Sequence, residues 1–357
     1  MTETNFIPRH TLYPRPLAAG SKIAVTAFSS GVEAECHPRL NKVLANLRAQ
    51  GFDVIEGQCL RQNIKHASAS KAQRAQELMR FLCDDSIDAV MPPWGGELAM
   101  DILPLLDYDR LRTVRPKWLV GFSDVSTVLT AMTTKLGWAT VHTANLMEMH
   151  PDEGCAFVTS VIPYLKQEAG ASLHQQSSTA YQIHGESFAV NPDTILKPCE
   201  QTYWKLLGKQ RSAAFRGRLI GGCFDILHHL VGTEYLDLNA LDRRFQGDGI
   251  ILYLENAEMS PTDLYRALLS LKYRGVFSKV NAVIFGRNAF ISDSMAADAN
   301  QAMTSEEALL SALDDIDIPV VYDADIGHLP PNLTLFNGAL AEVAVDNGRA
   351  TVTQYLK

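Results

Sequence analysis

The chain has 357 residues, of which 46% are hydrophobic and 20% are charged, a balance typical of folded globular proteins. Lys and Arg number 32 and Asp and Glu number 40, which gives a formal net charge of −8. This acidic balance argues against nucleic acid or an anionic membrane as the main partner, because both bind basic faces. At about 150 residues per domain, the length favours two domains.

The sequence pattern favours a cytoplasmic protein. No apolar run reaches the roughly 18 residues that cross a bilayer, and the first residues lack the basic and apolar parts of a signal peptide. The six cysteines are scattered, without a Cys-x-x-Cys pair, which is typical of reduced thiols rather than of disulfides or a zinc knuckle. We expect no membrane segment, no metal and no other cofactor.

The first part of the chain alternates short apolar runs with amphipathic stretches. Strands are predicted at 22–28, 52–55, 87–91 and 118–122, and helices at 38–50, 70–84, 98–105 and 125–135. Strands that alternate with helices favour a parallel sheet with helices on its faces. We therefore predict an open, mostly parallel α/β domain over residues 1–165.

Regular periodicity stops between residues 166 and 214, where Gln, Ser, Gly and Pro interrupt the chain. A connection of this length is uncommon in a compact domain and usually serves a site or joins two domains. We interpret it as a linker with a loop that covers a site.

The last part mixes helices and strands. Strands are predicted at 217–220, 249–254, 280–285 and 320–322, and helices at 224–231, 261–272 and 305–314. Two alternating runs, 342–345 and 351–355, flank Asp346-Asn347-Gly348, which is a strong hairpin signal. These elements predict a C-terminal mixed α/β domain over residues 215–357.

Ser123 lies between a predicted strand and a predicted helix. A serine on such a sharp turn has its hydroxyl lifted out of the sheet, and the backbone N–H of the next residue, Asp124, points to where an oxyanion would form. Ser123 is therefore a candidate nucleophile. The final glycine of the Gly-x-Ser-x-Gly motif is missing, since Val125 stands there, and a serine that merely caps the helix is the alternative.

A glycine turn follows the preceding strand. Gly95 and Gly96 let the backbone approach a ligand and leave amides that can receive an anion. The turn is not a phosphate-binding P-loop, because no Gly-Lys-Ser/Thr follows. An ordinary tight turn is the alternative.

Glu255 ends an apolar strand, and His328 lies in a Pro-rich loop further along the chain. The histidine would act as general base for Ser123, and the glutamate would orient the histidine, in the chain order Ser, Glu, His. Taken singly, a strand-end glutamate can be a solvated charge and a loop histidine is more often structural.

Together these blocks resemble the LD-carboxypeptidase family of serine peptidases, which includes the microcin C self-immunity peptidases. The resemblance covers roughly residues 15–357. It rests on short blocks in a fixed order, namely Gly95-Gly96, Leu105 to Asp109, Lys117 to Asp124, Arg218 to Gly222 with Leu254-Glu255, and Gly327-His328 with Leu333 to Leu335.

The resemblance implies that Ser123, Glu255 and His328 are catalytic and that the amides of Gly96 and Asp124 form the oxyanion hole. It also implies that the site assembles at the domain boundary and that the protein is a homodimer. The substrate expected first is a murein-like peptide, cleaved between an L-configured centre and a terminal D-amino acid. The alternative is a peptidyl or aminoacyl adenylate, the substrate of the microcin C branch.

Candidate substrate-binding residues lie around this set, namely Trp94, Gly95, Arg218 and Cys223. Arg218 is interpreted as an anchor for an anionic group, with a surface ion pair as the alternative. Cys223 stands where the family usually has asparagine, after Gly221-Gly222, and this departure puts the substrate in doubt.

Three other interpretations stay open at this point. A metal-dependent hydrolase would use Asp323, Asp325 and His328, which lie close in sequence, or the adjacent His228 and His229. A non-catalytic module would use the same cleft to hold a peptide or nucleotide, and the presence of Cys223 in place of the family's asparagine supports this alternative. A cysteine hydrolase would use Cys223 itself as the nucleophile.

Overall fold

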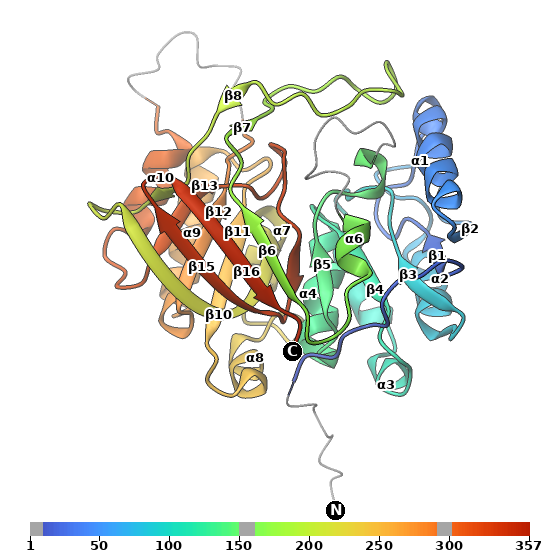
Figure 1. Ribbon diagram of the computed structural model, residues 1–357, viewed down its shortest axis with the longest axis horizontal. Helices are drawn as coiled ribbons and strands as arrows, with labels where there is room; N and C mark the ends of the chain where they lie inside the picture. The colour runs from blue at the N-terminus through green and yellow to red at the C-terminus, as the bar shows by residue number, and fades with distance from the viewer. Residues whose placement is uncertain (1–9, 150–160, 291–301) are drawn as a thin grey trace, which may run out of the picture.

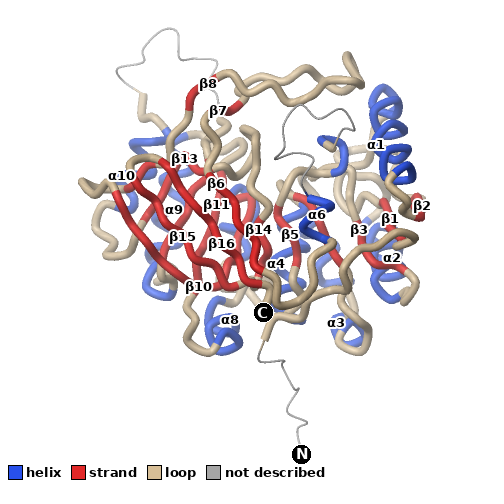
Figure 2. The backbone as a smooth tube through the Cα atoms, in the orientation of Figure 1, coloured by secondary structure: helices blue, strands red, loops and turns tan. Residues whose placement is uncertain are grey.

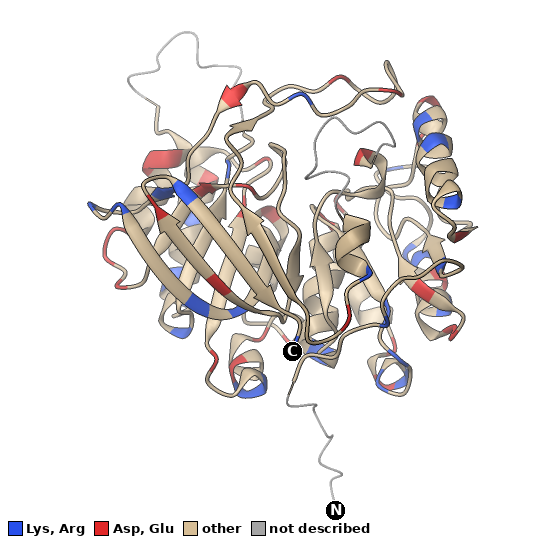
Figure 3. Cartoon of the chain, in the orientation of Figure 1, with Lys and Arg blue, Asp and Glu red and all other residues tan. Residues whose placement is uncertain are grey.

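The computed structural model describes residues 10–149, 161–290 and 302–357. Two sheets lie side by side, each with helices packed against it (Figures 1 and 2). Basic and acidic residues are interspersed along the elements of both halves (Figure 3). Within the described ranges, every helix is too short or too polar to cross a bilayer.

The N-terminal sheet has six strands in the order β14-β5-β4-β3-β1-β2. They are β1 (Lys22–Val25), β2 (Asp53–Glu56), β3 (Ile87–Val90), β4 (Trp118–Gly121), β5 (Thr140–His142) and β14 (Leu335–Asn337). The strands from β5 to β2 run parallel, whereas β14 pairs with β5 antiparallel. The predicted mostly parallel α/β sheet is confirmed, and its edge strand β14 comes from the C-terminal part of the chain.

Helices cover both faces of this sheet. Ile23 and Val25 of β1 lie in one core with α1 (His37–Ala49), whereas Ala24 lies in another with α2 (Lys71–Cys83) and α4 (Val125–Leu136). Successive side chains of a strand point to opposite faces, so both faces of β1 are buried by helices. Burial on both faces explains why strands of such a sheet appear in the sequence as apolar runs without alternating polar residues.

The C-terminal sheet has eight strands in the order β6-β16-β15-β10-β11-β12-β13-β9. They are β6 (Ser172–Gln176), β9 (Lys205–Leu206), β10 (Ser212–Cys223), β11 (Ile250–Glu255), β12 (Ala282–Gly286), β13 (Val320–Ala324), β15 (Leu340–Asp346) and β16 (Arg349–Tyr355). Strands β10 to β13 are parallel, and the outer strands pair antiparallel. The predicted mixed α/β architecture is therefore confirmed.

One apolar core runs through both halves. It joins α4 beside the N-terminal sheet to the helices of the C-terminal half, which are α7 (Phe224–Leu230), α8 (Leu238–Phe245), α9 (Pro261–Tyr273) and α10 (Ser305–Leu313). Each Å² of apolar surface removed from water contributes about 25 cal/mol to stability. This shared core therefore fixes the two sheets relative to each other.

Short elements complete the described chain. They are the 3-10 helices η1 (Ala34–Cys36), η2 (Ala99–Leu105), η3 (Leu146–Glu148) and η4 (Phe277–Lys279), the helices α3 (Tyr108–Leu111) and α6 (Val161–Leu165), and the paired strands β7 (Ala180–Tyr181) and β8 (Glu200–Gln201).

Two predictions about elements need correction. The stretch 166–214 is not without regular structure, because it holds β6 to β9 and the start of β10. The segment 98–105 forms the 3-10 helix η2 rather than an α-helix, and Pro104 lies inside it, where its ring cannot sit in an α-helix without a clash.

Candidate active site

Ser123 lies on a tight turn between β4 and α4. Its backbone φ is 62°, a left-handed conformation that non-glycine residues rarely adopt and that is typical of strained functional turns. Asn145 stabilises this turn, because its Oδ1 accepts a hydrogen bond from the N–H of Phe122 at 3.0 Å. A Cβ on Gly121 would lie 2.5 Å from that same oxygen, so only glycine fits there.

The fold brings three residues from distant parts of the chain into one hydrogen-bonded row. Nε2 of His328 lies 3.0 Å from Oγ of Ser123, and Nδ1 of His328 lies 2.9 Å from Oε2 of Glu255. The Glu255 side chain is fully buried, whereas 29% of the His328 side chain is exposed. A hydroxyl, an imidazole and a carboxylate therefore lie in the order and at the distances that an activated serine needs.

The histidine and the carboxylate stabilise each other's charged forms. Burial by itself raises the pKa of Glu255, but the charge and hydrogen bond of His328 outweigh burial and lower the pKa of this carboxyl. Burial by itself lowers the pKa of His328, but the Glu255 carboxylate outweighs it and raises that pKa to about 9. The pair therefore favours an imidazolium once a proton reaches His328.

The glycine turn lies directly against Ser123. A Cβ on Gly95 would come within 2.7 Å of the Ser123 Cβ and 2.8 Å of the Asp124 amide nitrogen. Gly96 has a φ of 140°. Neither the Gly96 amide nor the Asp124 amide donates to a group within the described ranges. Two unused donors next to a hydroxyl form a suitable receptor for an oxyanion.

The Asp124 side chain joins the two turns, a role that sequence reasoning missed. Its carboxylate accepts the Ser29 hydroxyl at 2.5 Å and the Ala99 amide at 2.8 Å, and Thr127 donates to its other oxygen at 3.1 Å. These bonds fix the start of η2 relative to the serine turn. The sequence offers only an acidic residue at a helix start as a signal, which is common at helix caps.

The residues considered for a metal site face different partners. Asp323 pairs with Lys205 at 2.9 Å, whereas the buried Asp325 accepts from Arg287 at 2.7 Å and from Trp204 at 2.9 Å. Among the side chains that the structure describes, no group of three or more His, Cys, Asp or Glu is placed to hold a metal ion.

Two family models match the chain in the same order as the two sheets. The model of the LD-carboxypeptidase N-terminal domain matches residues 23–143, and that of the LD-carboxypeptidase C-terminal domain matches residues 216–343. The chain belongs to the LD-carboxypeptidase family.

This family member is similar along its length to the microcin C7 self-immunity protein MccF of Escherichia coli, with 28% identity over 355 residues that cover 98% of each chain. It is 29% identical to the murein tetrapeptide carboxypeptidase of Pseudomonas aeruginosa over 110 residues, which are 31% of this chain and 35% of that protein. The solved structure of MccF in complex with glutamyl sulfamoyl guanosine matches with a TM-score of 0.78 and 26% identity, covering 97% of this chain and 100% of that chain.

Trp94 and Cys223, two residues predicted to bind substrate, lie at the edge of the site. The Trp94 indole N–H lies 3.2 Å from the carbonyls of Ser30 and Gly31, so it fixes the loop beside the glycine turn. Cys223 is only 1% exposed, and its thiol donates to Asp225 at 3.5 Å. Burial raises the pKa of the Cys223 thiol well above its usual value, which disfavours a thiolate nucleophile at this position.

The prediction that Arg218 binds substrate needs correction. Its guanidinium donates to Asp248 at 2.8 Å and to the carbonyls of Gly338 and Lys357 at 3.0 and 2.6 Å. Arg218 and Cys223 are five residues apart on β10, or about 16 Å at the strand rise of 3.3 Å per residue. Arg218 therefore binds the Lys357 carbonyl at the end of the sheet that lies away from Cys223.

Glu148 is another residue near the site that sequence reasoning missed. One of its carboxylate oxygens accepts the Asn145 amide at 2.7 Å. Burial raises the pKa of Glu148 to about 7, and the neighbouring charges of His328 and Arg39 lower it in part. Nothing in the local sequence of η3 distinguishes this glutamate from a surface charge.

A strap, here residues 182–199 between β7 and β8, connects the two halves. Its first amide, that of Gln182, donates to the carbonyl of Pro330 at 2.9 Å, two residues after His328. Its far end reaches α1, where Arg39 donates to the carbonyls of Pro192 and Thr194 at 3.1 and 2.9 Å. Figure 1 shows the strap extending from β8 toward α1. The predicted loop within 166–214 thus spans both halves beside the histidine.

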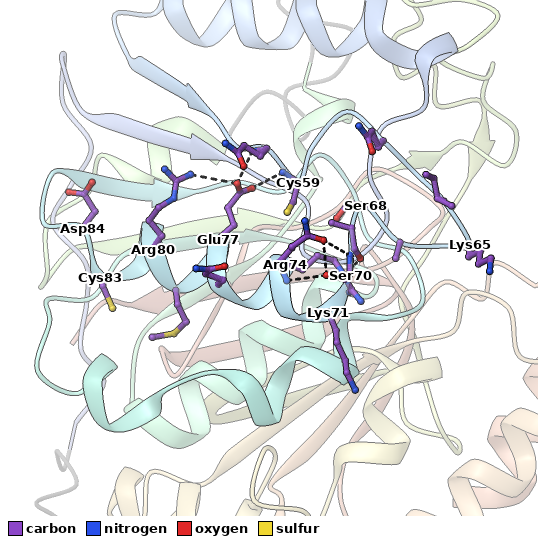
Figure 4. A pocket seen from close by; sticks show the side chains of 18 of the residues that line it. Cys59, Lys65, Ser68, Ser70, Lys71, Arg74, Glu77, Arg80, Cys83 and Asp84 are labelled. Atoms are coloured by element: carbon purple, nitrogen blue, oxygen red, sulfur yellow. Dashed lines mark hydrogen bonds and ion pairs between the residues drawn. The ribbon is translucent and has the colours of Figure 1, made fainter.

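A separate cavity of about 1200 Å³ lies against α2 and the loop before it. Figure 4 shows its polar lining, which includes Lys71, Arg74 and Glu77. Two of its charged lining groups already have protein partners, since Glu77 accepts the amides of Gln58 and Cys59 at 2.7 and 2.9 Å and Arg74 donates to Asp101 at 3.0 Å. Ser123, Glu255 and His328 do not line this cavity.

Proposed function

We propose that this protein is a serine hydrolase that cleaves an amide bond at the end of a small peptide or aminoacyl conjugate, through an acyl-enzyme on Ser123. The observation that carries the proposal is the continuous row from the Ser123 hydroxyl through His328 to Glu255, at 3.0 and 2.9 Å. Hydrogen bonds of this length on both imidazole nitrogens fix the tautomer and aim one nitrogen at the hydroxyl.

The proposed reaction follows from these positions. Nε2 of His328 takes the Ser123 proton as the oxygen attacks the carbonyl carbon, and Glu255 stabilises the imidazolium that forms. The amides of Gly96 and Asp124 receive the oxyanion, and each such donor contributes roughly a hundredfold to a thousandfold in rate. His328 then protonates the leaving nitrogen, and a water molecule, deprotonated by the same imidazole, releases the acyl group.

Two substrate classes fit this reaction. A murein-like peptide with a terminal D-amino acid is the first candidate, because the chain belongs to the LD-carboxypeptidase family. An aminoacyl or peptidyl nucleotide is the second candidate. It is favoured by similarity to MccF over 98% of the chain and by the MccF structure in complex with glutamyl sulfamoyl guanosine.

A mass-spectrometric assay of both classes tests the proposal. The purified chain is incubated with a murein tetrapeptide and with an aminoacyl adenylate that carries a phosphoramide bond, beside the Ser123→Ala variant. We expect the wild type to release product from at least one class, and the variant to be slower by a factor on the order of 10⁴ or more. Equal turnover by the two proteins would refute the serine mechanism. Binding without turnover would indicate a non-catalytic relative.

The compartment and the assembly are part of the same proposal. Six scattered cysteines without a Cys-x-x-Cys pair support a cytoplasmic protein with free thiols, and the resemblance to the family supports a homodimer. Light scattering coupled to gel filtration measures the mass in solution. A mass near that of a single chain, 39.3 kDa, would contradict the dimer.

A further inference from the structure

His142 lies at the end of β5, buried beneath the proposed catalytic row. It is 0% exposed, and neither ring nitrogen has a hydrogen-bond partner among the described residues. A buried polar atom without a partner destabilises the folded state, so a side chain with two such atoms calls for a physical reason. Packing alone does not supply one, because an apolar side chain of similar size would avoid this cost.

The same neighbourhood holds a second polar atom without a partner. Oε2 of Glu255 accepts from His328, but Oε1 is buried and has no partner among the described residues. Carboxylates that stay ionised when buried usually accept several hydrogen bonds. One oxygen of the proposed triad carboxylate is therefore short of a donor.

His142 packs against β11, the strand that ends in Glu255. The His142 ring centroid lies 5.2 Å from that of Tyr253, which precedes Glu255 by two residues on β11, and 6.1 Å from that of Phe122. The Phe122 ring in turn contacts the His328 ring at 4.8 Å. Glu255 would stabilise a protonated His142, although burial outweighs this effect.

The other titratable groups around Glu255 have partners of their own. The Tyr253 hydroxyl donates to Asn337 at 2.7 Å. The Cys223 thiol, on the neighbouring strand β10, donates to Asp225 at 3.5 Å, and as a weak donor it also helps to lower the pKa of the Glu255 carboxyl. Glu148 and Asp225 act on His328 only through their charges. Among these groups, His142 is the buried donor without a partner.

We propose that His142 is a positioning residue that donates a ring N–H to Oε1 of Glu255, directly or through one water molecule, and so holds the carboxylate against His328. The inference rests on the proposed function, since Glu255 acts here only by orienting His328. The bond would satisfy both groups at once and would keep the other carboxylate oxygen aimed at Nδ1 of His328.

Burial suits His142 to this role. It lowers the pKa of His142 to about 4, so the ring is neutral at pH 7 and donates one N–H without adding a second positive charge beside His328. Removing this N–H would make the electrostatic potential around His328 more negative. The imidazolium would then persist to higher pH, and the neutral base would be available only there.

The test measures how fast a fluorophosphonate modifies Ser123 from pH 5 to 10, in the wild type and in His142→Phe, His142→Asn and His142→Gln. We expect His142→Phe to move the midpoint of the rate profile to higher pH by about half a unit to one unit, which makes labelling up to roughly tenfold slower below the midpoint. Of His142→Asn and His142→Gln, the variant whose side-chain N–H lies where the native donor lies restores the midpoint. Tyr253→Phe, which removes a hydroxyl bonded to Asn337 instead, leaves it unchanged.

The outcomes separate this inference from the proposed function. If the wild type is not labelled at Ser123, the proposed function fails. If it is labelled and the His142→Phe profile coincides with it, or if neither amide reverses the shift, the positioning role is overturned. Should His142→Phe not fold, nitrogen NMR of the wild-type ring decides. A neutral, hydrogen-bonded ring at pH 7 supports the role, and an imidazolium contradicts it.

Discussion

At the scale of single residues, the site depends on a backbone conformation that few side chains tolerate. Ser123 has a φ of 62°, and the cost of such a conformation is of order 1–3 kcal/mol. The turn persists because Asn145 and the carboxylate of Asp124 hold its two sides. The result is a hydroxyl fixed 3.0 Å from an imidazole nitrogen before any substrate arrives.

The electrostatics of His328 predict the pH dependence of hydrolysis. Only the neutral imidazole can take the Ser123 proton, and Glu255 raises the pKa of His328 from 6.5 to about 9. We therefore expect kcat/KM to rise with pH through a midpoint clearly above 6.5. Stopped assays between pH 5 and 10 measure it, and a midpoint at or below the ordinary value would contradict the coupling.

Glu255→Gln is the matched control for that profile. It removes the negative charge and leaves the shape of the side chain nearly unchanged, so the midpoint should fall toward the ordinary histidine value. The plateau should drop by a factor on the order of 10⁴, because the neutral amide no longer stabilises the imidazolium or selects its tautomer.

The sequence predicts the residues of the proposed catalytic row better than the residues that support them. Ser123 and His328 follow strands and Glu255 is the last residue of one, and this order along the chain, together with the family resemblance, selects them. The side chains of Asp124, Glu148 and His142 gain their roles from neighbours far away in sequence. Such contacts leave no pattern in the local sequence. The interpretation of Arg218 as a substrate anchor fails for the same reason, because its partners Asp248 and Lys357 lie far away in sequence.

At the scale of elements, the strap depends on one buried cation. Arg39 of α1 is 1% exposed, donates to two strap carbonyls and lies 4.6 Å from the centre of the Phe188 ring. Its replacement would leave those carbonyls without a charged donor. The end of the strap would then lose its attachment to the N-terminal half.

Limited proteolysis measures this attachment. We expect Arg39→Ala to lower the free energy of unfolding by about 2–4 kcal/mol and to make residues 182–199 much more sensitive to protease. Lys42→Ala is the control, because its ion pair with Asp193 is solvent-exposed and such pairs contribute at most about 1 kcal/mol. Equal cleavage of the two variants would show that Arg39 does not hold the strap.

The elements also show where sequence periodicity stops being informative. The hairpin around Asp346-Asn347-Gly348 is confirmed as β15 and β16, because its turn residues and alternation are local signals. Strand β6 was missed because Gln175, one of its two buried residues, is polar, so its sequence shows no apolar alternation. Strand β14 was missed because its three residues pair with β5, almost two hundred positions away.

At the scale of the whole molecule, the two halves form one cooperative structure. The apolar core continues from α4 into α7 and α9, and β14 inserts a C-terminal segment into the N-terminal sheet. We expect heat or denaturant to unfold both halves in a single transition. Near-ultraviolet and far-ultraviolet circular dichroism should give coincident curves, and two separated transitions would contradict the shared core.

The central claim is that Ser123, His328 and Glu255 act as one relay. Mass spectrometry of the chain after reaction with a fluorophosphonate, followed by peptide mapping, tests it most directly. The account predicts one adduct per chain, on Ser123, and its near-complete loss in a folded His328→Ala variant. Modification of another residue in the wild type, or undiminished modification of Ser123 without His328, would contradict it.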